Sequence, residues 1–143
     1  MSSDNGEGSL ERLIAELARP PFHEWLKPTA ASVDVERREI EIGVSYRREL
    51  SHDPEAGIFH GGVVAALVDI TGYAAVAIWQ DIATPTIALH VEYLRPAVGD
   101  ELRARGMLRR MGRAVARVDV EVSVAGSLVA LGRASYSIAR VQR

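Results

Sequence analysis

A long apolar stretch in the middle of the chain, from about Gly61 to Gln80, limits the available folds more than any other feature of the sequence. It is rich in Ala, Val and Leu, contains no Pro, and has apolar residues on every side of a helical projection. A helix that is apolar all round is buried, because a surface helix has only one apolar stripe. A charge at the centre of a bilayer costs about 3 kcal/mol on insertion scales, and Asp69 lies in the middle of this stretch. We therefore predict a helix buried within the protein, not one that spans a membrane.

The segments on either side of this helix show the two-residue alternation of β-strands. The alternation is clearest where valine and alanine alternate with charged and polar residues between 113 and 125. Residues 49–59 contain Pro54, Gly57 and three acids, so we predict a loop there. The predicted strands cover residues 29–36, 38–47, 86–94, 100–111, 113–125 and 127–140.

The order of these elements indicates one α+β domain. A single helix buried on all sides needs a sheet curled around it, and 143 residues is the usual size of one domain. Residues 1–8 are polar and acidic and are predicted to be a disordered tail, so the domain spans 9–143, with a helical segment at 9–28. In that segment an apolar cluster either packs against the domain edge or covers a pocket; its members are Phe22, Trp25 and Leu26.

The composition argues against several functions. A formal net charge of −2 provides no positive field for nucleic acid or an anionic membrane. The chain has no cysteine and therefore no disulfide, zinc thiolate or Cys nucleophile. The four histidines lack metal-ligand spacing, so no metal is expected. The N-terminal residues lack the basic start and apolar core of a secretory signal, and we expect a soluble, cytoplasmic protein.

The buried helix begins at His60-Gly61-Gly62. Helix N-termini have free N–H groups and a partial positive charge, and glycines let a ligand oxygen approach the backbone closely. This start is a candidate oxyanion hole. Alternatively, the glycines only permit a tight turn from loop to helix.

Asp69 is the one charged residue of the helix. Burying an unpaired carboxylate is costly, so Asp69 must meet water, substrate, a partner side chain or neighbouring backbone, and it is either catalytic or structural. It lies seven residues beyond Gly62, which is two turns and about 10 Å along the helix axis. That distance is too long for both residues to act on one carbonyl within one subunit. If both are catalytic, the site requires two chains.

An arginine-rich stretch between 103 and 117 is the third candidate feature. The planar guanidinium suits phosphate groups, and the RRMGR turn places Arg110 and Arg113 beside Gly112. The alternative is a solvated face of the sheet.

Residues 51–138 resemble the PaaI-like branch of the hotdog thioesterases. The resemblance rests on three segments: G-I-F-H-G-G-V-V-A-A-L-V-D from Gly57 to Asp69, T-I-A-L-H-V-E-Y-L-R-P-A from Thr86 to Ala97, and M-G-R from Met111 to Arg113. It implies a hotdog fold, in which a curved antiparallel sheet wraps a long helix. It also implies hydrolysis of acyl-CoA at sites that lie across a dimer interface. Members of the family often form a dimer of dimers. No cofactor is expected, because coenzyme A is part of the substrate.

The resemblance also implies roles for individual residues. The Gly62 N–H would bind the thioester carbonyl, and Asp69 of the other subunit would activate water or attack directly. Thr86, or else Thr84, would orient the water. His60 and Gly61 complete the motif, and Arg110, Gly112 and Arg113 would hold coenzyme A.

The sequence departs from the family pattern at two positions. Many members have Asn where this chain has Pro54, for which His52 or Asp53 could substitute, and many have Asp in place of Ala88. The departure at Pro54 favours a second hypothesis, a non-catalytic acyl-CoA or lipid-binding module. A dehydratase or hydratase on the same fold is the third. The sequence does not indicate the acyl group. The last strand, with Leu128, Ala130 and Tyr136 on one side and Val129 and Leu131 on the other, could form a second interface.

Overall fold

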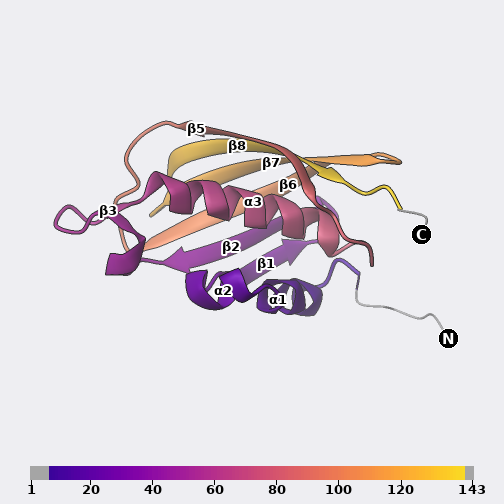
Figure 1. Cartoon of the computed structure of the whole chain (residues 1–143), viewed down its shortest axis with the longest axis horizontal. Helices are drawn as coiled ribbons and strands as arrows, with labels where there is room; N and C mark the ends of the chain where they lie inside the picture. The colour runs from indigo at the N-terminus through magenta and orange to yellow at the C-terminus, as the bar shows by residue number, and fades with distance from the viewer. Residues whose placement is uncertain (1–6, 141–143) are drawn as a thin grey trace.

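The computed structural model describes residues 7–140, and its centre is one long helix against a six-stranded antiparallel sheet (Figure 1). The strands are ordered β1-β2-β6-β7-β8-β5, and every neighbouring pair is antiparallel. This confirms the predicted α+β hotdog arrangement. The elements are α1 (Leu10–Ala18), α2 (Pro21–Leu26), β1 (Thr29–Asp34), β2 (Glu39–Ser45), η1 (Arg48–Leu50), β3 (Ser51–Asp53), β4 (Ile58–Phe59), α3 (Gly61–Ala77), β5 (Thr86–Tyr93), β6 (Glu101–Met111), β7 (Val115–Val124) and β8 (Ser127–Ser137).

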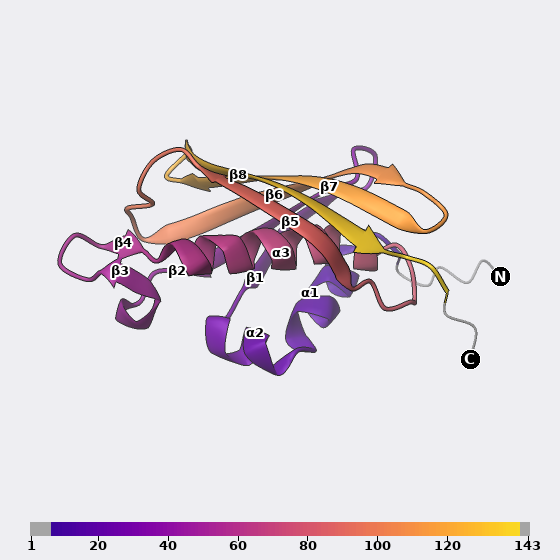
Figure 2. The ribbon, with the colours of Figure 1, turned by 45° about the horizontal axis from the view of Figure 1, so that its top comes forward.

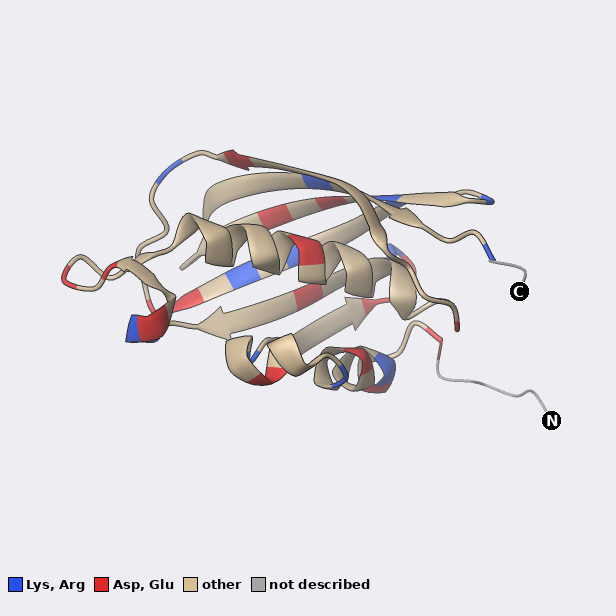
Figure 3. Cartoon of the chain, viewed as in Figure 1, with Lys and Arg blue, Asp and Glu red and all other residues tan. Residues whose placement is uncertain are grey.

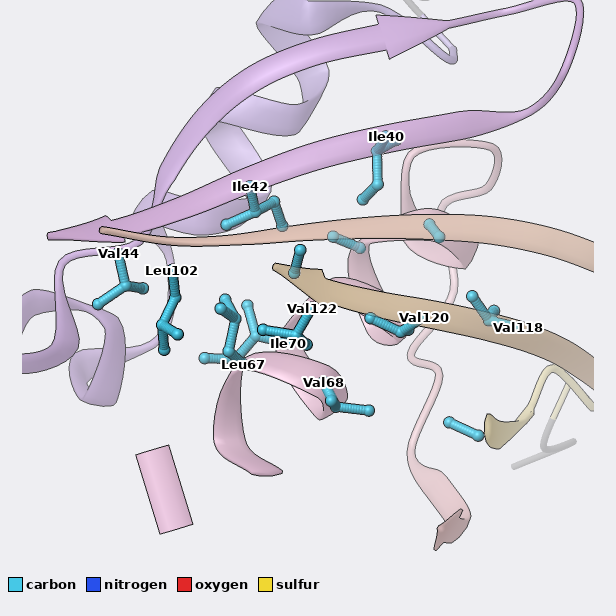
Figure 4. Packing of buried hydrophobic residues seen from close by; sticks show 14 of the residues in the cluster. Ile40, Ile42, Val44, Leu67, Val68, Ile70, Leu102, Val118, Val120 and Val122 are labelled. Carbon is cyan, nitrogen blue, oxygen red and sulfur yellow. The ribbon is translucent and has the colours of Figure 1, made fainter. Parts of the chain in front are cut away.

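The helix α3 is the predicted buried helix, and it lies in the concave face of the sheet (Figure 2). Apolar side chains of β2, β6 and β7 point at it and form the core (Figure 4), among them Ile40, Ile42, Val44, Leu102, Val118, Val120 and Val122. Two inward positions of the sheet are glycines, Gly106 on β6 and Gly132 on β8. A Cβ on Gly106 would lie 2.9 Å from Thr71, and one on Gly132 would lie 2.3 Å from Val68. The missing side chains therefore let the helix lie close to the sheet.

The N-terminal helices pack beside α3 and β1. Ser9 caps α1, because its hydroxyl accepts the Arg12 N–H at 3.0 Å. Leu26 of α2 is buried, whereas Phe22 and Trp25 are about half exposed. Of the two alternatives for this cluster, the structure therefore shows packing at the domain edge, through Leu26.

The boundary of the predicted tail at residue 8 is wrong. The N–H of Gly8 donates to the carbonyl of Ile78 at 2.7 Å, and Gly8 is buried. Gly8 therefore belongs to the domain. The rest of the predicted tail, apart from Glu7, lies outside the described residues, as do residues 141–143.

The segment predicted as a loop, 49–59, contains short regular elements. Two residues of η1 lie in it, and β3 pairs with β4 to form a small hairpin. The hairpin carries the chain to the first turn of α3. Among residues 7–140, no helix has the length and apolar character needed to cross a membrane.

Candidate active site

Asp69 is the only charged residue of α3, and it appears as the single red segment in the middle of that helix (Figure 3). The side chain is partly buried. The hydroxyl of Thr86, at the start of β5, donates to Oδ1 of Asp69 at 2.8 Å. The structure thus joins two of the residues singled out in the sequence, Asp69 and Thr86, and Thr84 makes no hydrogen bond to Asp69. Thr84 is buried and lies beside Tyr73.

Tyr136 of β8 is a second partner of Asp69, and sequence reasoning missed it. Its hydroxyl lies 3.0 Å from the backbone O of Asp69 and 3.2 Å from Oδ1. The ring is fully buried against α3, so Tyr136 cannot form a second interface, contrary to the prediction. Burial raises the pKa of Tyr136, and the charge of Asp69 and the hydrogen bond to it act in the same direction. The phenol is therefore a stable hydrogen-bond donor.

The first turn of α3 presents one free glycine N–H. His60 is the N-cap, and its Nδ1 accepts the Gly62 N–H at 2.8 Å. The N–H of Gly61 has no acceptor among the described residues. The hydroxyl of Tyr93 on β5 donates to the Gly61 carbonyl at 2.6 Å, and its ring lies 3.5 Å from the position that a Cβ on Gly61 would take. The N–H group available to a ligand oxygen is therefore that of Gly61, whereas the predicted donor, Gly62, is occupied by the cap.

A cavity of about 390 Å³ opens beside Gly61. Most of its lining is apolar, and the residues that form it are His52, Ile58, Phe59, Gly61, Val64, Tyr93, Leu94, Arg95, Pro96, Ala97, Val129 and Ala130. The ring of His52 lies 6.0 Å from that of His60. Asp53 instead accepts the N–H groups of Glu55 and Ala56 in the β3–β4 turn. Of the two residues considered in place of the family Asn, only His52 faces the cavity.

The arginine turn lies at the opposite end of α3. Arg113 and Gly112 line a second cavity, of about 590 Å³, together with Trp79 and Gln80 beyond the helix C-terminus. Gly112 closes the β6–β7 turn, since its N–H donates to the Val115 carbonyl at 3.0 Å. A helix of 17 residues is about 25 Å long. Within one chain, the structure therefore does not bring the arginine turn together with the HGG start.

Strand β5 forms an edge of the sheet and pairs only with β8 among the described strands. Three large apolar side chains of β5 are unusually exposed: Ile87 is 57% exposed, Leu89 39% and Tyr93 53%. Large contiguous apolar patches on a soluble protein mark interaction sites. Thr86 and Tyr93, which contact Asp69 and Gly61, belong to this edge strand.

The outer face of the sheet carries ion pairs rather than an apolar patch. Asp119 of β7 accepts hydrogen bonds from Arg109 and Arg133, at 3.0 and 2.8 Å, and Arg105 pairs with Glu121. The hydrogen bond from Arg133 lowers the pKa of Asp119, and Arg109 adds to the effect. Among residues 7–140, no group of three or more His, Asp or Glu side chains is arranged to hold a metal ion.

Comparison with known proteins identifies the family to which the chain is similar. The model of the thioesterase superfamily matches residues 56–131, which include the HGG start, Asp69 and the arginine turn. A candidate esterase of Halobacterium salinarum is 34% identical over 119 residues, which cover 75% of this chain and 78% of that protein.

Solved structures agree in fold. A protein of the thioesterase superfamily is 37% identical, with a TM-score of 0.83, over 90% of this chain and 97% of the other. A candidate thioesterase of Ralstonia eutropha, described as related to phenylacetic acid degradation, is 28% identical, with a TM-score of 0.78. The match covers 90% of this chain and 98% of the other.

Proposed function

Because the chain belongs to the thioesterase superfamily, in its PaaI-like hotdog branch, we propose that it hydrolyses acyl-CoA at a site shared by two subunits. Thioester hydrolysis in general follows from the family. The observation that carries the finer proposal is the contact between Asp69 and Thr86, at 2.8 Å, beside the exposed edge strand β5. A carboxylate held there by a hydroxyl can take a proton from a water molecule.

The two-subunit site is supported by the positions of the groups in one chain. The free Gly61 N–H and Asp69 are eight residues apart on α3, which is about 12 Å along the helix axis. Both border β5, whose exposed apolar side chains fit a second copy of the chain. In an antiparallel pair of helices, the start of one α3 lies near the middle and end of the other. Asp69 and the arginine turn of one subunit then approach Gly61 of its partner.

In the proposed reaction, Asp69 takes a proton from water as the water oxygen attacks the thioester carbonyl. The carbonyl oxygen gains negative charge, which the Gly61 N–H and the N-terminus of α3 stabilise. Collapse of the tetrahedral intermediate breaks the C–S bond, and the proton passes to the leaving thiolate. The products are the free acid and coenzyme A.

Coenzyme A carries phosphates, and the proposal assigns them to the arginine turn. Arg110 and Arg113 are exposed, and they form no ion pair with any described residue. Other arginines of the sheet, such as Arg105 and Arg109, are paired with acids. Unpaired guanidinium groups are available for a phosphate ligand.

The test is thiol release from a panel of aryl, short-chain and long-chain acyl-CoAs. Wild type is compared with Asp69→Asn and Asp69→Ala, with circular dichroism and size-exclusion chromatography as controls of folding and assembly. We expect both variants to lose at least about a hundredfold in kcat, the low end of an acid–base contribution. Saturable binding of coenzyme A esters without turnover by wild type would instead support the binding module that Pro54 favours.

A further inference from the structure

The buried phenol of Tyr136 has no part in the proposed chemistry so far, although it contacts the proposed catalytic carboxylate. Its hydroxyl lies 3.2 Å from Oδ1 of Asp69, the oxygen that also accepts the Thr86 hydroxyl, and 3.0 Å from the Asp69 backbone oxygen, so its one proton is shared between these two acceptors. No described residue donates to Oδ2. The two oxygens of this carboxylate therefore have different surroundings: one is held by hydroxyl groups and the other is free.

The fold provides for this contact in two ways. Thr86 and Tyr136 are direct partners across β5 and β8, so both side chains reach the same turn of α3. On that turn, Gly72 leaves room for the phenol, because a Cβ there would lie 2.2 Å from the Tyr136 hydroxyl oxygen. Any other residue at position 72 would displace the hydroxyl from Asp69. The glycine in the middle of an otherwise well-formed helix thus has a local function.

We propose that Tyr136 is a positioning residue for the proposed hydrolysis. Its hydroxyl and that of Thr86 fix Oδ1 of Asp69, which orients the carboxylate so that Oδ2 is the oxygen that takes the proton from water. Hydrogen bonds from two elements restrict rotation of a side chain that α3 alone would leave mobile. The role rests on the proposed function, since a positioned base matters only if Asp69 is the base.

No charged side chain in the described part of the molecule forms an ion pair with the carboxylate of Asp69. On α3, Tyr73 lies one turn further on, and it faces Glu16 of α1 and Arg19, which caps the C-terminus of α1. Apart from tyrosines, the titratable and charged residues of β5 and β8 are His90, Glu92 and Arg133, and all three line the cavity on the outer face of the sheet. In one chain, the side-chain groups that donate to Asp69 are therefore the hydroxyls of Thr86 and Tyr136.

The experiment compares Tyr136→Phe with wild type on whichever acyl-CoA wild type hydrolyses. Tyr46→Phe is the matched control, because the Tyr46 hydroxyl is buried without a hydrogen-bond partner. In Tyr136→Phe we expect kcat to fall about ten- to a hundredfold, the effect of losing a hydrogen bond to a charged group, with KM within about threefold. The acid limb of the kcat/KM profile should move to higher pH, because the carboxylate loses a donor that favours its ionised form.

A second variant tests the same contact without removing it. Incorporation of 3-fluorotyrosine at position 136 keeps the hydroxyl and makes it a stronger donor, so the acid limb should move to lower pH while kcat is retained. A merely structural role for the ring predicts no movement of the acid limb in either variant.

The results distinguish a failure of the role proposed for Tyr136 from a failure of the proposed function. An unchanged kcat and pH profile in Tyr136→Phe, or an equal loss in Tyr46→Phe, overturns the proposed role of Tyr136 while thioester hydrolysis stands. Failure of wild type itself to hydrolyse any thioester overturns the proposed function, and this role with it.

Discussion

The Nδ1 atom of His60 accepts the N–H of Gly62 at 2.8 Å, so the histidine of the HGG start caps the helix that it precedes. Removal of an N-cap side chain by alanine typically costs about 1 kcal/mol of protein stability. We therefore expect His60→Ala to lower the free energy of unfolding by about that amount, and His60→Asn to retain most of it, because asparagine caps helices well. Urea denaturation of the three proteins measures this. Equal stability of His60→Ala and wild type would show that the cap contributes nothing.

Thr86 holds Oδ1 of Asp69 through a hydroxyl that valine lacks but serine keeps. We expect Thr86→Val to reduce kcat by about tenfold or more, as the loss of a hydrogen bond to a charged group does. Thr86→Ser should retain most of the activity. The matched control is Thr84→Val, at a buried position two residues earlier that does not contact Asp69, and it should behave as wild type. If serine and valine at position 86 are equally impaired, the methyl group rather than the hydroxyl is what matters.

The sequence was sufficient for the fold but not for the detailed surroundings of Asp69. The apolar helix and the alternating strands predicted the curled sheet because burial on all sides leaves few other arrangements. Tyr136, however, lies in a strand whose two faces both carry apolar residues, and its inward direction depends on the pairing of β8 with β5. That pairing contains a register shift between Thr86 and Ala88, which no local pattern reveals. The contact also depends on Gly72. In a single sequence, a glycine at that position shows only a low helix propensity.

The start of α3 shows a second limit of sequence reasoning. The family resemblance predicts that a glycine N–H binds the thioester carbonyl and that this glycine is Gly62. Which N–H is free depends on the rotamer of His60, whose ring turns back to Gly62 and leaves Gly61 without an acceptor. Side-chain conformations of this kind follow from packing around the turn, not from spacing in the chain.

A substitution of Arg113 tests whether the arginine turn binds the phosphates of coenzyme A. Arg113→Ala should raise KM for an acyl-CoA severalfold and leave KM unchanged for the N-acetylcysteamine ester of the same acid, because the short ester has no phosphate to bind. Arg103→Ala is the charge-matched control, since Arg103 is paired with Glu101 on the outer face of the sheet. An equal change in KM for both esters would mean that Arg113 affects binding of the acyl group or folding of the protein, and not binding of the phosphates.

The hydrogen bonds of Asp119 to two arginines should make the free energy of unfolding depend on pH. Its pKa in the folded protein is lowered, mainly by the hydrogen bond from Arg133. A lowered pKa means that the stabilisation is present above the unfolded value of about 4 and is lost as pH falls through the folded value. Asp119→Asn should therefore lose less stability than wild type between pH 7 and pH 3, as measured by urea midpoints. Asp100→Asn, at a position without an ion pair among the described residues, should match wild type, and identical curves for Asp119→Asn would contradict the role of the network.

A substitution of Gly132 tests whether the glycines on the inner face of the sheet determine how closely α3 packs against the sheet. A Cβ at Gly132 would lie 2.3 Å from a methyl carbon of Val68, and a valine in a helix has little freedom to turn aside. Overpacking of this kind costs about 1–3 kcal/mol, so Gly132→Ala should lower the free energy of unfolding by about 2 kcal/mol. Gly43→Ala is the control, because a Cβ there meets only the mobile end of Glu101, at 3.2 Å, and Thr29. In a Val68→Ala background the clash is absent, so Gly132→Ala should cost clearly less there. Additive costs in the double variant would mean that the two residues do not oppose each other, and that the helix is held off the sheet by other contacts.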